Sequence, residues 1–76
     1  MHDDRLELLH HMFSIVTEML ETAHEEATRA QARGLTAAEH LDSAKTVRLI
    51  AQNVLGLSDA ISINAAELES PAEVPE

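Results

Sequence analysis

The sequence predicts an all-α fold: an antiparallel helical hairpin of two long helices that dimerises into a four-helix bundle. Two unbroken series of apolar residues, spaced alternately by three and four positions, indicate two amphipathic helices. A glycine followed closely by a helix-capping motif predicts a short turn between them, at residues 34–36. With 76 residues, of which 45% are hydrophobic, the chain forms one small domain that cannot bury a large core.

The first helix is predicted at about residues 4–33. Asp4, with Glu7 three positions later, fits the start of a helix, and Gly34 can adopt the left-handed conformation that ends one. Between them, the apolar residues form a heptad seam. The seam consists of Leu6, Leu9, Phe13, Val16, Leu20, Ala23, Ala27 and Ala30.

The second helix is predicted at about residues 37–69. Thr36 and Glu39 form a capping box immediately before its apolar series begins. Gly56 costs the helix about 1 kcal/mol relative to alanine, but the apolar phase continues past it, so we expect one helix. Its seam consists of Ala44, Val47, Ala51, Val54, Ser58, Ile61, Ala65 and Leu68. The hairpin domain therefore covers residues 1–69, and we expect the acidic, proline-containing tail at 70–76 to be frayed.

Each helix also carries apolar residues beside its seam, and a lone hairpin would leave them in water. We expect them to form the interface of a homodimer, although a monomer with scattered surface apolar residues is the alternative. The predicted oligomer interface consists of Leu8, Met12, Ile15, Met19, Ile50 and Leu57. This architecture is similar in shape to that of small dimeric hairpin regulators such as the plasmid copy-control protein Rop, although no motif is shared.

The charge distribution favours an antiparallel dimer, in which the two turns lie at opposite ends. The net charge is −9, and it divides into about −6 over residues 1–28, +2 over 29–48 and −5 over 49–76. Antiparallel pairing places the basic turn of one hairpin near the acidic open end of the other.

The outer side of the second helix carries a further apolar set. Leu49, Gly56 and Ile63 follow a heptad, and Leu41 and Leu55 form a neighbouring pair. We expect these five residues to be candidates for docking a protein partner. Ordinary surface aliphatics or a higher oligomer explain them equally well.

The spacing Glu-x-x-His, which di-metal helical bundles use, occurs at Glu7–His10 and again at Glu21–His24. At 100° per residue these side chains fall opposite or at the edge of the apolar arc, and the two motifs lie about 21 Å apart. We therefore expect no metal site, with a ferritin-like metal-binding hairpin as the alternative. His40 falls on the core stripe of the second helix, where we expect it to be half-buried and bonded to backbone.

No pattern in the sequence indicates catalysis. The chain has no cysteine, no nucleophile elbow around its serines and no glycine-rich phosphate loop, so we expect neither an enzyme nor a bound cofactor. No secretory signal and no run of about 20 apolar residues is present, which predicts a cytoplasmic protein that does not contact membranes.

Fourteen acidic residues against five basic ones disfavour nucleic acid as a ligand. The sequence therefore predicts a non-catalytic, homo-oligomeric protein-interaction module that serves as an adaptor, regulator or assembly subunit. The alternative is an acidic inhibitor or antitoxin-like protein that covers a basic site on a nucleic-acid-handling partner.

Overall fold

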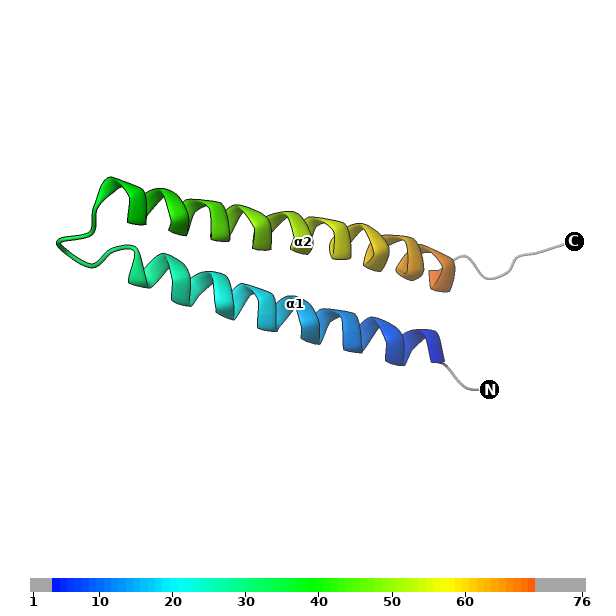
Figure 1. Ribbon diagram of the computed structural model, residues 1–76. Helices are drawn as coiled ribbons and strands as arrows, with labels where there is room; N and C mark the ends of the chain where they lie inside the picture. The colour runs from blue at the N-terminus through cyan, green and yellow to red at the C-terminus, as the bar shows by residue number, and fades with distance from the viewer. Residues whose placement is uncertain (1–3, 70–76) are drawn as a thin grey trace, which may run out of the picture.

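The computed structural model describes residues 4–69 as an α-helical hairpin. Helix α1 spans Asp4–Arg29 and helix α2 spans Ala37–Glu69, and the two run antiparallel along each other (Figure 1). Within this range the chain contains no β-strand. The predicted helical hairpin is confirmed, and the predicted bounds of the second helix agree with those of α2. The tail at 70–76 lies outside the described residues.

The connection between the helices is longer than predicted. Helix α1 ends at Arg29, four residues earlier than the sequence pattern indicated. The amides of Gln31 and Ala32 each donate to the carbonyl three positions back, at 3.1 Å. These bonds span three residues where an α-helix spans four, so the α-helical pattern ends here. The apolar seam has no member after position 30, so no packing on α2 holds the next turn in a helix. Gly34 then adopts the left-handed conformation, with a φ of 84°.

The start of α2 is fixed by the predicted capping box. The Thr36 amide donates to Glu39 Oε1 at 2.8 Å, and the Glu39 amide donates to Thr36 Oγ1 at 3.1 Å. These reciprocal bonds satisfy two amides that a helix N-terminus otherwise leaves to water. From there α2 continues through Gly56 without a break, which confirms the prediction of one helix.

The helices contact each other along a line that differs from the predicted seam. The buried side chains are Leu9, Met12 and Ile61, which are 6–8% exposed and lie toward the open end of the hairpin. Met12, which we expected between two chains, is instead buried inside one hairpin. Phe13, which we placed in the intrachain seam, is 55% exposed.

The reason for this difference is that each helix has one neighbour and buries one narrow line of side chains. On α1 that line passes between the two predicted apolar stripes and takes members from both. Other residues predicted for the oligomer interface are half-buried along the same line, whereas Leu8 is 45% exposed. The half-buried ones are Ile15, Met19, Ile50 and Leu57.

Two polar contacts between the helices fix their relative position. Near the turn, Ser43 Oγ donates to Glu26 Oε2 at 2.7 Å. At the open end, Arg5 pairs with Glu67. In cross-section the hairpin measures 19 × 11 Å, so it is two helices wide and one helix thick. Each helix therefore leaves most of its circumference uncovered by the other.

We expect Thr36→Ala to lower the free energy of unfolding by about 1 kcal/mol, because it removes the side-chain half of the capping box. Thr46→Ala is the matched control, since Thr46 is exposed within α2 and caps nothing. Urea denaturation at one fixed protein concentration measures both. Equal effects of the two substitutions would show that the capping box does not contribute to stability.

Candidate functional site

The most prominent feature of the surface is its exposed apolar area. Among residues 4–69, nine large hydrophobic side chains are 39–64% exposed, against three hydrophobic residues that are buried. Isolated exposed aliphatics are normal, but contiguous ones mark interaction surfaces. The nine are Leu6, Leu8, Phe13, Leu20, Leu41, Leu49, Leu55, Ile63 and Leu68.

One broad side of the hairpin carries a regular apolar pattern, which we call the heptad face. Helix α1 contributes Leu6, Phe13, Leu20 and Ala27, which are seven positions apart and therefore form a nearly straight row. Helix α2 contributes a matching row of small residues, Ala44, Ala51, Ser58 and Ala65. The two rows lie on the same side of the molecule, because Ala27 and Ala44 line one groove.

That groove lies near the turn, where small residues from both helices leave a shallow hollow of about 420 Å³. Ala30 and Val47 also line it, and His40 and Arg48 stand at its edge. We predicted His40 to be half-buried, but it is exposed, because the alanines beside it are too small to cover it. The groove is apolar with a basic margin.

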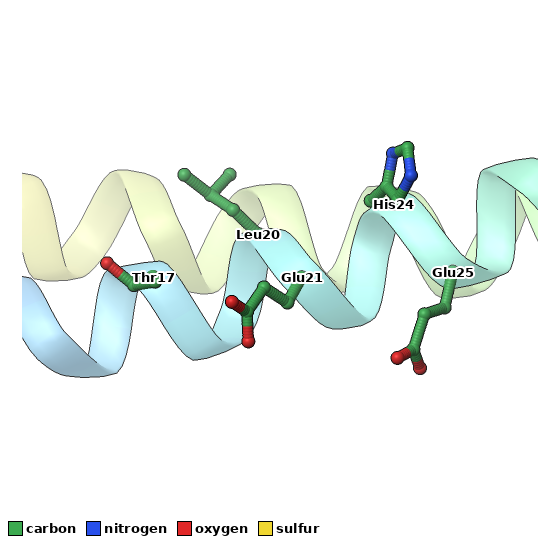
Figure 2. Close-up of a pocket in the computed structure, with 5 residues that line it drawn as sticks. All are labelled: Thr17, Leu20, Glu21, His24 and Glu25. Atoms are coloured by element: carbon green, nitrogen blue, oxygen red, sulfur yellow. The ribbon is translucent and has the colours of Figure 1, made fainter.

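A second shallow hollow, of about 380 Å³, lies against α1 beside Leu20 (Figure 2). Thr17 and His24 also line it, and the side chains of Leu20 and His24 point to the same side of the helix. Glu21 and Glu25 complete its margin. The exposed Leu20 side chain therefore stands beside an open hollow of its own helix.

The Glu-x-x-His pairs are not brought together with further ligands. Over residues 4–69, no three histidine, cysteine or acidic side chains are grouped so that they could hold a metal ion. Glu7, His10, Glu21 and His24 are all exposed, as the helical wheel predicted. Each pair therefore offers two ligands at most, which is fewer than structural or catalytic metal sites use.

The residues predicted to dock a partner are all exposed on α2. Their aliphatic members, Leu41, Leu49, Leu55 and Ile63, are 56–64% exposed. At Gly56, a Cβ atom would meet no heavy atom within 4 Å, so no contact inside the hairpin requires a glycine there. The space above Gly56 is thus open for close approach from outside.

One half-buried group was not singled out from the sequence. The Glu26 side chain is only 14% exposed, pairs with Arg29 on its own helix and accepts a hydrogen bond from Ser43 of α2. Four glutamates between positions 18 and 26 made it indistinguishable from a solvated acid by sequence. The half-burial of Glu26 could have been predicted from its position in the buried line, three residues after Ala23 and four before Ala30.

We expect the purified protein to contain no stoichiometric metal, and Glu21→Ala combined with His24→Ala to change stability by less than about 0.5 kcal/mol. Both side chains are exposed, so their removal leaves no cavity and no unpaired buried group. Elemental analysis and thermal denaturation with and without added Zn²⁺ are the measurements. Stoichiometric iron, zinc or manganese would contradict this prediction.

Within residues 4–69, neither helix combines the length and the hydrophobicity needed to cross a bilayer. The chain matches no protein-family model, no curated protein and no solved structure. Its function is therefore inferred from the exposed surfaces and charges of the hairpin itself.

Proposed function

We propose that this protein is a non-catalytic interaction module that works as a homo-oligomer, as a dimer of antiparallel hairpins in a four-helix bundle. The observation that supports this is the apolar surface that a single hairpin leaves exposed. Within residues 4–69, nine large hydrophobic side chains are 39–64% exposed, whereas three hydrophobic residues are buried. Contiguous exposed apolar side chains of this kind mark protein–protein interfaces.

The energetics of the exposed side chains favour association. Complete burial of a leucine or phenylalanine stabilises a protein by about 1.5–3 kcal/mol, so each half-exposed one can still contribute roughly 1 kcal/mol. Phe13 and Leu20 from each of two chains would alone contribute roughly 4 kcal/mol. Small domains have stabilities of only about 5–15 kcal/mol, so this contribution is a substantial share.

Electrostatics favour the antiparallel arrangement within such a dimer. Four of the five basic residues lie between positions 29 and 48, at or near the turn, and the flanking segments are acidic. Pairing with the turns at opposite ends brings unlike charges together. Pairing with the turns at the same end would gather the acidic open ends.

We expect the thermal midpoint to rise with protein concentration, because dimerisation couples folding to mass action. Circular dichroism melts over a hundredfold concentration range measure this, and sedimentation equilibrium gives the mass. A monomer that keeps full helicity at micromolar concentration would contradict the proposal.

We further propose that the outer side of α2 binds a protein partner, through Leu49, Gly56 and Ile63 with Leu41 and Leu55 beside them. The exposed leucines and isoleucine supply apolar area, and the open space at Gly56 permits the close approach of a partner helix. The proposed biological role is that of an adaptor, regulator or assembly subunit.

We expect Leu49→Glu and Ile63→Glu each to abolish capture of the partner by the tagged chain, while helicity and dimer mass are preserved. Thr46→Glu is the matched control, because it adds the same charge to an exposed position of α2 outside the proposed surface. Pull-down, circular dichroism and sedimentation are measured in parallel. Unfolding by either substitution would show that these residues belong to a core. A partner released above about 0.5 M salt would instead indicate an acidic inhibitor held by charge.

A further inference from the structure

Successive members of the predicted heptad seam alternate between exposed and covered positions along the whole of α1 and along the first half of α2. On α1, the seam members that face α2 are Leu9, Val16, Ala23 and Ala30, which are buried or half-buried. The members between them, the α1 row of the heptad face, are all exposed. On α2, Val47, Val54 and Ile61 are covered, whereas Ala44, Ala51 and Ala65 are exposed. Two α2 members depart from the alternation, because Ser58 is half-buried and Leu68 is 39% exposed.

Such alternation is what one half of a four-helix bundle shows. In a bundle each helix has two neighbours, and successive seam members face one neighbour and then the other. The hairpin supplies the first neighbour of each helix, so the exposed members are those that would face a second one. A lone hairpin or an ordinary amphipathic surface does not require a heptad repeat on its uncovered side.

We propose that the second neighbour is another copy of this chain, seated antiparallel on the heptad face with its own heptad face. This inference rests on the proposed homo-oligomer and assigns its interface and register. It replaces the interface predicted from the sequence, because Met12 and the half-buried members of that set pack inside one hairpin.

The positions of the two rows are compatible with a single two-fold axis that relates two antiparallel copies. In such a dimer the two-fold axis is perpendicular to the helices and crosses both of them. The centres of the two rows must therefore lie at the same level along the hairpin. The α1 row, positions 6 to 27, is centred between residues 16 and 17, and the α2 row, positions 44 to 65, between 54 and 55. The interhelical contacts Glu26–Ser43 and Arg5–Glu67 place those two centres beside each other.

This register pairs large side chains with partners of fitting size. On the two copies of α1, Phe13 lies opposite Leu20 of the second copy, and Leu6 lies opposite Ala27 of the second copy. On the two copies of α2, small residues oppose small ones, so these helices can approach closely. The end of each α1 row with large side chains thus meets the end of the second row with small ones.

Charge at the margin of this interface agrees with the same axis. Arg48 and Asp59 are both exposed and lie on the same flank of α2. The midpoint between them in the sequence falls between residues 53 and 54, within one residue of the axis. In the antiparallel dimer, Arg48 of each copy therefore lies beside Asp59 of the second copy. Opposite charges at this margin favour the proposed orientation.

Cysteine crosslinking tests the face and the orientation together, because the chain has no cysteine of its own. Thr17 lies next to the proposed axis and lines the hollow beside Leu20. In the Thr17→Cys variant, we expect the two cysteines to come within disulfide range and to give a covalent dimer on mild oxidation. The matched control is Glu18→Cys, an exposed position one residue on, about 100° around the helix, where we expect no crosslink.

A dimer that crosslinks through Glu18→Cys, or through neither variant, would overturn the proposed face while leaving the homo-oligomer standing. With the turns at the same end, α1 would face α2 of the second copy, and Thr17→Cys would again fail to crosslink. A chain that sediments as a monomer would overturn both proposals.

Matched substitutions of exposed leucines on α1 give an independent measurement. Leu20, on the heptad face, is 53% exposed and Leu8, on the other side of the helix, is 45% exposed. We expect Leu20→Glu to weaken dimerisation by about a hundredfold or more, because it places a carboxylate in an apolar interface. Leu8→Glu should change the dimerisation constant by less than about threefold. The reverse order would overturn the proposed face.

Discussion

Each helix of this hairpin has one helical neighbour, and that constraint determines what the rest of the molecule can do. A helix that meets a single partner buries one narrow line of side chains, here centred on Leu9, Met12 and Ile61. All other apolar residues stay partly exposed to water, including those that the sequence periodicity assigns to the intrachain seam. The thin cross-section, the large surface and the exposed heptad face all follow from this one limit.

Features set by local chemistry could be predicted from the sequence. Thr36 and Glu39 specify the start of α2 because their hydrogen bonds close within four residues. The continuity of α2 through Gly56 follows from an apolar phase that a single glycine does not outweigh. The end of α1 could not be placed to the residue, because it depends on where packing against α2 stops and not on a local signal.

The partition of apolar residues could not be predicted, because it depends on the number and position of neighbouring helices. Sequence periodicity identifies a broad apolar arc on α1 but not the line within it that α2 covers. We therefore expected Phe13 inside the hairpin and Met12 on its outside, whereas Met12 is buried and Phe13 is exposed. His40 was misplaced for a related reason, since its burial required larger neighbours than the alanines of the turn end. The exposure of the predicted partner surface on α2 was foreseen correctly, whereas Glu26 resembled the solvated acids around it.

The position of the buried cluster has a consequence for how the chain folds. Leu9 and Ile61 are separated by 52 positions, so the strongest contacts are also among the most distant in sequence. Beside the turn, where closure of a short loop costs the least entropy, the chain offers mainly alanine and a serine–glutamate hydrogen bond. Folding that starts at the turn thus gains little stability until the helices are nearly complete. The two helices must therefore be largely formed before the contacts between them make the tertiary structure stable.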